Sequence, residues 1–477
     1  MSDYIPVIGL EVHAELATDS KIYCGCPTSF GAGENTHICP GCLGMPGTLP
    51  LLNRKAVELC VTAGLALHCE INLLSRQDRK HYFYPDLPKG FQVSQLDLPV
   101  CGRGYLDIEV NGATRRIGIN RIHIEEDAGK LIHGQHETRV DLNRGAAGLI
   151  EIVSEPDLSS PEEVYAYMEA LREILLFCGV SDCKMEEGSL RCDVNISVHR
   201  EGEPFGVRTE MKNLNSLSAA KAATAYEIER QRQVLEEGGS LVQATLRWDE
   251  TKGLNYIMRL KEQADEYYYF PEPDIRPIVV RPEEIETLRA SLPEMPGARR
   301  QRYREQYALS DYDASVLTVS RALSDLFDEA VAVGAPAKTC ANIIMGDITR
   351  LLNEKAMTPE QTPFGGGNLA ELATLISEGA ISSTAGSKVV ELMFQPDHAG
   401  KSPKAIVGEQ NLGQVSDEAA IRVMCRDVVD QNPKVAADYR GGRKQAISAL
   451  VGQVMKASKG KANPGLVNRI LVDILEE

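Results

Sequence analysis

The sequence lacks the features that mark membrane proteins and secreted proteins. No apolar run approaches the roughly 18 residues that a membrane-spanning helix requires. The opening residues, MSDYIPVIGL, contain neither the basic region nor the long apolar segment of a secretion signal. Twelve cysteines in 477 residues are too few for a secreted scaffold held by disulfides. We therefore expect a cytoplasmic protein that has no membrane partner.

The common nucleotide-binding signatures are missing as well. A P-loop has a glycine five residues before its Gly-Lys-Ser, whereas the AGKS at 399–402 has Gln395 at that place. The GGGNLA at 365–370 fits a dinucleotide fingerprint by its letters, but it follows TPF and no predicted strand. If the protein uses ATP, its site must be of another type. The net charge of −17 argues against a general nucleic-acid binder, although a local basic patch can override the global balance.

The composition is that of a globular protein, with 43% hydrophobic and 25% charged residues, and the length allows two to four domains. Alternating apolar residues predict strands at 104–110, 115–125, 147–153 and 190–200. Apolar residues at helical spacing predict helices within 160–180 and 217–239. The first part of the chain is therefore predicted to be α+β, with a large, mostly antiparallel sheet.

The pattern changes at SLPEMPGARRQRY, residues 291–303, where two prolines and a glycine fall close together. The segments beyond it have helical spacing, and a second irregular stretch covers residues 394–410. We predict three domains: an α+β domain at 1–293, an all-α domain at 294–404 and a small helical tail domain at 405–477.

Four cysteines are grouped near the N-terminus as CGC and CPGC, separated by twelve residues. Two close thiol pairs on turns can supply the four ligands of a tetrahedral Zn²⁺ site. The alternative is a set of ordinary cysteines that includes a redox-active CxxC. The spacing favours a structural zinc site, with these ligands: Cys24, Cys26, Cys39 and Cys42.

A row of polar residues follows the first predicted strand. In VIGLEVHAEL, Glu11, His13 and Glu15 alternate with apolar residues, so they share one face of the strand. Carboxylates also occur in or next to other predicted strands. They are Glu125, Glu126 and Asp127; Glu151, Glu155 and Asp157; Asp193; and Glu210, which is near Lys212. A single set of this kind is ordinarily a solvated strand face. Several sets together favour a Mg²⁺ site, because clustered carboxylates repel one another unless a cation relieves them.

A basic and aromatic segment, DRKHYFYPDLPKGFQVSQ, complements these acids. Its cations could neutralise a nucleotide triphosphate while its aromatic rings pack against the base. The alternative is an ordinary turn with basic flanks. The residues concerned are Arg79, Lys80, His81, Tyr82, Phe83, Tyr84 and Lys89.

These motifs make the chain resemble the B subunits of tRNA-dependent amidotransferases. The resemblance is carried by GLEVHAEL, RKHYFYPDLPKGFQVSQ, HIEEDAGK, DLNRGAAGLIEIVSEPD, MEEGSLRCDVNISV and EMKNLNS, and it continues through YYYFPEPD, YDASVLT and GQVMKASKGKANP. One departure is the GAAG at 145–148, where family members commonly have a second glycine or Gly-Thr-Pro.

The resemblance implies a cradle-shaped catalytic domain followed by the two helical domains. It implies that ATP phosphorylates the side-chain carboxylate of misacylated Glu-tRNA(Gln), and of Asp-tRNA(Asn), and that ammonia then displaces phosphate. A separate glutaminase subunit would supply the ammonia, and a small linker subunit would complete the complex.

The family's site residues can be carried over by motif. The Mg²⁺ ligands map to Glu11, His13, Glu126 and Glu151, with Glu125 as the near alternative to Glu126. The resemblance implies catalytic roles for Lys80, Asp193 and Glu125. Together with the basic segment, it implies nucleotide contacts for Lys80, His81, Tyr84, Lys89, Glu210 and Lys212.

The tail contains a basic stretch within an otherwise acidic chain. Residues 440–469 carry seven arginines and lysines and no acid. A solvated helix face is the ordinary explanation of a charge run, but the complete absence of acids favours a phosphate-binding surface. We predict tRNA contacts at Arg443, Lys444, Lys456, Lys459 and Lys461.

Two other functions remain open on sequence grounds. The chain could be a non-catalytic tRNA-binding scaffold whose carboxylate pocket is vestigial. A lone glutamine-using amidotransferase fits poorly, because we find no Ser- and Gly-rich amidase tract.

Overall fold

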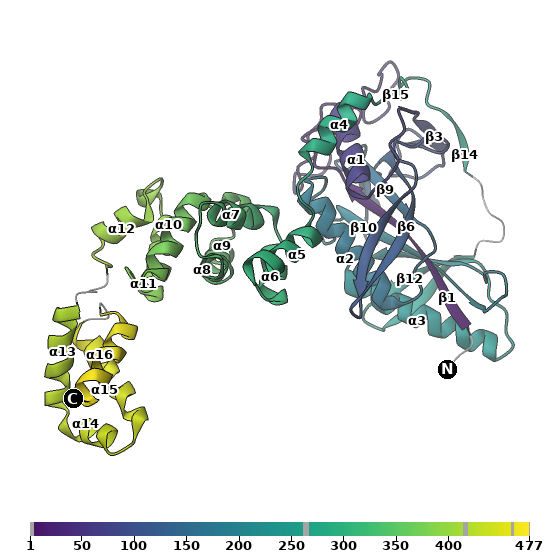
Figure 1. The fold of residues 1–477 in the computed structure, drawn as a ribbon. Helices are drawn as coiled ribbons and strands as arrows, with labels where there is room; N and C mark the ends of the chain where they lie inside the picture. Colours follow the sequence, from purple (N-terminus) through teal and green to yellow (C-terminus); the bar gives the residue numbers. More distant parts are fainter. Residues whose placement is uncertain (1–3, 261–266, 414–417, 459–461, 477) are drawn as a thin grey trace. The chain divides into compact units, whose positions relative to one another are not determined.

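The computed structural model describes residues 4–260, 267–413, 418–458 and 462–476. The chain divides into two units, Met1–Met295 and Pro296–Glu477, shown in Figure 1. In the described part of the chain, no helix combines the length and the apolar character needed to cross a membrane.

The first unit is built on an eight-stranded sheet with the strand order β13-β12-β11-β10-β1-β9-β6-β5. Its strands are β1 (Tyr4–Glu15), β5 (Gly104–Val110), β6 (Ala113–Glu126), β9 (Gly148–Ser154), β10 (Leu190–Arg200), β11 (Thr209–Leu214), β12 (Ala244–Asp249) and β13 (Leu254–Leu260). Every neighbouring pair is antiparallel except β11 and β12, which are parallel. The predicted α+β class with a mostly antiparallel sheet is confirmed.

The described residues of this unit also form three small sheets. The strands are β2 (Leu74–Ser75), β3 (Asp78–His81), β4 (Phe91–Ser94), β7 (Lys130–His133), β8 (Thr138–Asp141), β14 (Tyr268–Pro271) and β15 (Ile278–Val279). Strand β3 lies between β14 and β4. This small sheet positions the basic segment that contains Lys80.

Helices cover one face of the large sheet. They are α1 (Arg54–Ala66), α2 (Pro161–Phe177), α3 (Leu217–Glu236) and the peripheral α4 (Pro282–Ser291). Helix α1 packs on β6, α2 on β5 and α3 on β10. The Ser160 hydroxyl caps α2 by accepting from the Glu163 amide, and Gly179 follows its end at φ +64°.

The alternation of β1 separates the two faces of the sheet. Ile8, Leu10, Val12 and Ala14 are buried in the core with helix residues such as Tyr167. The intervening residues project from the opposite face, which the helices leave open. The row of polar side chains on β1 therefore lies on the open face.

The second unit is helical. Its elements are α5 (Pro296–Tyr307), α6 (Asp311–Leu317), α7 (Arg321–Ala332), α8 (Ala337–Ile343), η1 (Ile344–Ile348), α9 (Thr349–Glu354), η2 (Pro359–Gln361), α10 (Gly366–Ser377), α11 (Ser383–Met393), η3 (Pro396–His398), α12 (Pro403–Glu409), α13 (Glu418–Gln431), α14 (Pro433–Arg440), η4 (Lys444–Ala446), α15 (Ile447–Ala457) and α16 (Pro464–Glu476). Two separate apolar clusters hold it, one from Tyr303 to Ile406 and one from Ile421 to Leu475. The predicted domain boundary at 404/405 falls within α12. Ile406 of this helix packs with the helices before it. The division into three domains stays a prediction.

Candidate functional site

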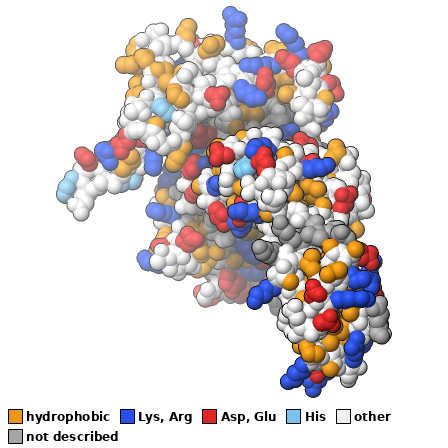
Figure 2. Space-filling model, turned by 90° about the vertical axis from the view of Figure 1, so that its left-hand side faces the viewer, with side chains coloured by type: hydrophobic (Ala, Val, Ile, Leu, Met, Phe, Trp, Pro, Cys, Tyr) orange, Lys and Arg blue, Asp and Glu red, His pale blue; other side chains and the backbone are white. Residues whose placement is uncertain are grey.

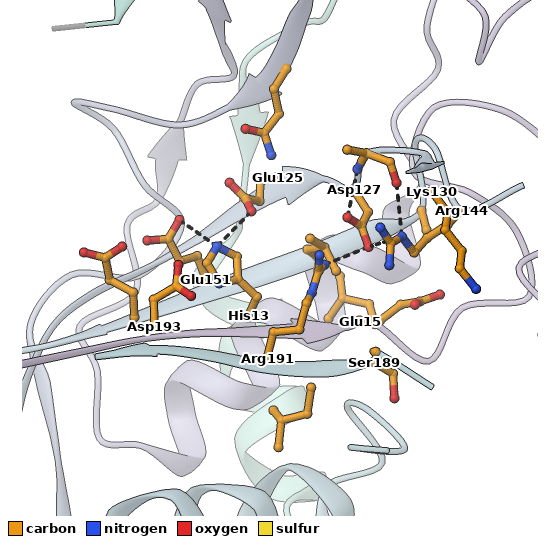
Figure 3. Close-up of a pocket in the computed structure, with 18 of the residues that line it drawn as sticks. His13, Glu15, Glu125, Asp127, Lys130, Arg144, Glu151, Ser189, Arg191 and Asp193 are labelled. Atoms are coloured by element: carbon orange, nitrogen blue, oxygen red, sulfur yellow. Dashed lines mark hydrogen bonds and ion pairs between the residues drawn. The ribbon is translucent and has the colours of Figure 1, made fainter. Parts of the chain in front are cut away.

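A cavity of about 1450 Å³ opens on the polar face of the large sheet. Glu11, His13 and Glu15 of β1 line it, together with side chains from β3, β6, β9, β10 and β11 (Figure 3). The alternating polar residues of the first strand thus face a large polar cavity.

Strand register brings His13 into an acidic cluster. Glu151 of β9 is the register partner of His13 on β1 and of His123 on β6. The Nε2 atom of His13 lies 3.4 Å from carboxylate oxygens of both Glu125 and Glu151, and Nε2 of His123 lies 3.2 Å from Glu151. Ligand atoms of His13, Glu125 and Glu151 lie within 4.8 Å of one another, a spacing that can hold a cation.

The electrostatics of this cluster favour its charged forms. Burial opposes charge on His123, but Glu151 and Glu125 outweigh it and raise the pKa of His123 to about 9. The same balance raises the pKa of His13. Burial would raise the pKa of Glu151, yet the two imidazoles bring that pKa well below its ordinary value. The neighbouring carboxylates thus favour the protonated form of both imidazoles, and a metal bound here would compete with those protons.

Glu125 and Glu126 point to different surroundings because neighbouring residues on a strand face opposite sides. Glu125 belongs to the cavity cluster. Glu126 is 1% exposed, and its carboxylate lies 2.5 Å from the Lys89 ammonium and accepts from the Val93 amide. The structure therefore brings Glu125 to His13 and Glu151, and it holds Glu126 in a buried ion pair outside the cavity lining.

A second group of carboxylates lies beside the first. Glu11 is the register partner of Asp193, and oxygens of Glu11, Asp193 and Glu210 lie within 4.8 Å of one another. The Lys212 ammonium lies 2.5 Å from Asp193 and 2.7 Å from Glu210. The Asn195 amide donates to Glu11 at 2.9 Å.

Burial and neighbouring carboxylates determine the charge states of this second group. Burial raises the pKa of Glu11, and the charge of Glu151 adds to the effect. Burial opposes charge on Lys212, but Asp193 and Glu210 outweigh it and raise its pKa. Lys212 therefore remains an ammonium ion at neutral pH.

Lys80 reaches the cavity from the small sheet. Its ammonium lies 4.7 Å from the centre of the Tyr267 ring. Burial would lower the pKa of Lys80, but the charge of Glu125 outweighs it and raises the pKa. Lys80 is thus a fixed positive charge facing the carboxylate cluster.

At another part of the cavity, two arginines converge on Asp127, which is 3% exposed (Figure 3). Arg191 donates to it at 2.7 Å, and Arg144 lies at 3.3 Å. Burial, reinforced by Asp127, raises the pKa of Glu15 to about 7. This group forms the part of the cavity wall next to His13, the register partner of Arg191.

The other predicted nucleotide contacts lie elsewhere. His81 is stacked on Phe270, with ring centres 4.7 Å apart, and it does not line the described cavity. Tyr84 and Lys89 belong to a turn that borders a separate shallow pocket. The structure therefore gathers Lys80, Glu210 and Lys212 at the cavity and leaves these three residues outside its lining: His81, Tyr84 and Lys89.

Sequence reasoning did not select several cavity residues. His123 shares its strand face with Glu125 two residues later, a period-two signal that was available. Asp127 was among the grouped carboxylates of the sequence, but its partner Arg191 meets it only through the pairing of distant strands, so no local pattern indicated Arg191.

The four grouped cysteines form a second candidate metal centre. Their sulfur atoms lie within 4.8 Å of one another, and all twelve cysteines of the chain are free thiols. Lys21, fully buried, places its ammonium 3.8 Å from Cys42 Sγ. A hydrogen bond from Cys24, the Cys39 amide and the Lys21 charge together lower the pKa of Cys42 to about 4 against the effect of burial. Four thiol sulfurs at this spacing suit tetrahedral Zn²⁺.

The basic stretch of the tail is partly neutralised by acids from outside it. Arg443 is 3.8 Å from Asp438, and Lys444 is 3.1 Å from Glu476. Lys456 is exposed on α15. Lys459 and Lys461 lie outside the described residues. On the face shown in Figure 2, basic and acidic side chains are interspersed.

Comparison with known proteins covers both units. Residues 6–286 match the family model described as the GatB/GatE catalytic domain, and residues 325–475 match the one described as the GatB domain. The chain is 52% identical over 476 residues to the B subunit of the aspartyl/glutamyl-tRNA(Asn/Gln) amidotransferase of Caldanaerobacter subterraneus subsp. tengcongensis, covering 99% of this chain and 100% of that protein. The proteins of the same name from Caldicellulosiruptor saccharolyticus and Clostridium botulinum are 52% and 50% identical over 481 and 477 residues, with 100% of each chain covered. The resemblance inferred from the motifs is confirmed, and the chain belongs to the GatB/GatE family, the B subunits of tRNA-dependent amidotransferases.

Proposed function

We propose that this chain is the subunit of a carbon–nitrogen ligase that activates the side-chain carboxylate of glutamate, or aspartate, esterified to tRNA. The cavity cluster of His13, Glu125 and Glu151, faced by Lys80, carries the proposal. A carboxylate is a poor acyl donor because its oxygen is a poor leaving group. Transfer of the γ-phosphoryl group of ATP to that oxygen releases ADP and gives an acyl phosphate. Ammonia then forms the C–N bond, the C–O bond to phosphate breaks, and a proton is lost.

The residues of the first cluster fit a Mg²⁺ ion by the chemistry of their donors. Two carboxylates and one imidazole within 4.8 Å offer hard oxygen ligands and one nitrogen. His13, Glu125 and Glu151 would hold the ion, with Glu11 beside them, and Glu126 is replaced by Glu125 in this assignment. When bound, Mg²⁺ supplies positive charge against phosphate oxygens.

The fixed charges around the cluster have separate roles in this proposal. Lys80 stabilises negative charge that develops on the transferred phosphoryl group. Asp193, held by Lys212, faces the same space and orients the reacting groups. Glu125 would bind the metal ion, and its negative charge also attracts the Lys80 ammonium.

The ammonia would come from a separate glutaminase subunit, with a small linker subunit completing a heterotrimer. Exposed apolar side chains support a surface that a partner covers: Leu49, Leu51 and Phe83 are 74%, 81% and 88% exposed. The cysteine loop and the 83–90 turn are neighbours, because a Cβ added at Gly44 would lie 2.3 Å from Lys89 Cγ. The isolated chain should therefore be inactive with glutamine, and full glutamine-dependent activity without partners would refute this partnership.

We also propose structural Zn²⁺ at the four cysteines, tRNA backbone contacts by the tail, and a cytoplasmic location. Twelve free thiols accord with a reducing compartment. The exposed cations Arg443, Lys444 and Lys456 would set the position of the tRNA without reading its bases.

The test uses the reconstituted complex with misacylated tRNA. Glu11→Ala, His13→Ala and Glu151→Ala should abolish tRNA-dependent ATP cleavage, while glutamine hydrolysis by the partner continues. The matched control is His199→Ala, which removes a histidine of β10 whose ring packs edge-on to Phe205 outside the cavity. Normal ATP cleavage by the three cavity variants would refute the assignment and would favour a non-catalytic tRNA-binding scaffold.

A further inference from the structure

Lys21 is a fully buried lysine at the start of the cysteine loop, which we define as residues 21–44. Its ammonium lies 3.8 Å from Cys42 Sγ and 3.2 Å from the carbonyl oxygen of Leu142. The described residues provide no carboxylate as an ion-pair partner for it. Because a buried charge is costly unless it is paired, the sulfur of Cys42, as a thiolate, is the anionic partner that the structure offers to Lys21.

The four-cysteine centre would carry an excess of negative charge once it holds zinc. Cysteine binds a metal as its thiolate, and four thiolates bring more negative charge than one Zn²⁺ offsets. The Cys39 amide donates to Cys42 Sγ at 3.2 Å, and the Lys21 ammonium adds a charged donor to the same sulfur. Donors of this kind, placed behind the ligands, influence how tightly a metal is held.

The second acceptor of Lys21 belongs to segment 140–147, which leads from β8 into β9 and is bound to the cysteine loop along its length. The Asn35 side-chain amide donates to the Val140 carbonyl at 2.9 Å, and its side-chain oxygen accepts from the Leu142 amide at 2.8 Å. Ala146, further along the segment, packs against the cysteines in a small apolar cluster. The cysteine loop and this segment therefore form one local structure.

The same segment forms part of the cavity wall. The Leu142 carbonyl that accepts from Lys21 also accepts from the Gly145 amide at 3.1 Å, which closes a turn around Arg144. Arg144 lies 3.3 Å from the Asp127 carboxylate (Figure 3). The residues of the segment that line the cavity are Asp141, Asn143, Arg144 and Ala147. Contacts thus run without a break from the cysteine sulfurs, through Lys21, to an arginine of the cavity wall.

We propose that Lys21 is a positioning residue that supplies positive charge to the cysteine centre and fastens that centre to segment 140–147, and through it to Arg144. The inference rests on the proposed zinc site. One ammonium has a thiolate and a carbonyl as its acceptors, so removal of its charge should affect the bound metal and the segment together. If Lys21 served only to fill space in the interior, removal of its charge would leave the metal unaffected.

The metal is tested in the full-length chain with Zn²⁺ and with Co²⁺ as a spectroscopic substitute. Lys21→Met removes the charge and keeps most of the side-chain volume. It should shift the sulfur-to-cobalt charge-transfer absorption to longer wavelength, because no cation then stabilises the thiolate electrons, while the d–d bands of a tetrahedral ion persist. Zinc should pass to a chromogenic chelator at least about tenfold faster than from wild type. Lys21→Gln, a second neutral variant that can still donate a hydrogen bond, should behave like Lys21→Met.

The segment is tested by hydrogen exchange of the amides of residues 140–147, measured by mass spectrometry. Lys21→Met should exchange faster there than wild type, and so should zinc-depleted wild type. The matched control is Asn35→Gly, which removes the side-chain contacts with the segment and suits the φ of +56° at this position. This control should also exchange faster in the segment, but its cobalt absorption and its rate of zinc transfer should be those of wild type.

An unshifted charge-transfer band in Lys21→Met, or zinc transfer as slow as from wild type, would overturn the proposal, and so would unchanged exchange in segment 140–147. Equally fast zinc transfer from Asn35→Gly would also overturn it, because loosening of the segment would then account for the whole effect. If wild type binds neither zinc nor cobalt, the zinc site itself fails and the role of Lys21 fails with it. The fluorescence of Trp248, the single tryptophan, checks that each variant is folded.

Discussion

The buried pair of Lys89 and Glu126 allows a test of whether Glu126 serves as the ion-pair partner of Lys89 or as a metal ligand. Both carboxylate oxygens of Glu126 lie 2.5 Å from the Lys89 ammonium, and the side chains of Glu126 and Lys89 are 2% and 14% exposed. Lys89→Met keeps the aliphatic stem, which packs beside Gly44, but leaves a buried carboxylate without its cation. Breaking such a pair costs about 3–5 kcal/mol of unfolding free energy.

The reverse change should cost less. Glu126→Gln keeps an oxygen that can accept from the Val93 amide, and the ammonium left behind is the more exposed partner. We expect a loss of about 1–3 kcal/mol. The double variant should lose about 2 kcal/mol less than the sum of the two single losses, because its second change removes a group that the first left unpaired.

The assay is urea unfolding followed by the fluorescence of Trp248, which lies on β12 and therefore reports on the first unit. The control is Lys55→Met, which breaks an exposed pair with Glu58 at 3.8 Å and should cost under about 1 kcal/mol. Additive losses, or a loss below about 1 kcal/mol in Lys89→Met, would refute the reasoning.

The same variants test the ligand assignment. If Glu126 only pairs with Lys89, then Glu126→Gln leaves Mn²⁺ affinity nearly unchanged, while Glu125→Gln lowers it by about tenfold or more. Equal losses of Mn²⁺ affinity in the two variants would show that Glu126 is a metal ligand.

Three further predictions concern other parts of the chain. Purified protein should contain about one zinc ion per chain, and serine at Cys24 and Cys39 should remove it; metal-free native protein would contradict the zinc site. Ala146, at φ +63°, should gain about 0.5–1 kcal/mol of stability on replacement by glycine in the same urea assay, and a loss would show that its methyl contacts outweigh the backbone strain. Deleting residues 414–477 from the complex should weaken tRNA binding and flatten its salt dependence; equal slopes would reduce the basic stretch to a solvated face.

The elements were predictable from sequence where the information is local. The strand at 104–110 and the start of α2 at its Ser160 cap follow from alternation and capping within a few residues. The parallel pairing of β11 with β12 was not predictable, because it depends on a helix and a loop returning the chain to the same edge. No local pattern specifies the register in which two distant strands pair.

In the candidate site too, some features follow from a local pattern and others depend on strand pairing. Glu11 and His13 share one face of β1 because side chains alternate along a strand, and the structure places both at the cavity. The choice between Glu125 and Glu126 also had a local signal, since only Glu125 shares the face of His123. By contrast, the convergence of Glu151 on two histidines needs β9 to lie between β1 and β6, which no single segment encodes.

Linear charge is the weakest of the sequence arguments, and the tail shows why. Residues 440–469 contain no acid, yet Asp438, Glu476 and Glu418 reach into this surface from just before it, just after it and from α13. Arg440 donates to the carbonyl oxygens of Leu475 and Ile474, so it caps α16 and is engaged in the fold. A cation that is already paired releases fewer counterions from RNA than an unpaired one. On a duplex, the logarithm of the binding constant falls by about 0.9 per phosphate contacted for each tenfold rise in salt. For tRNA binding we therefore expect a shallower salt dependence than seven unpaired charges would give.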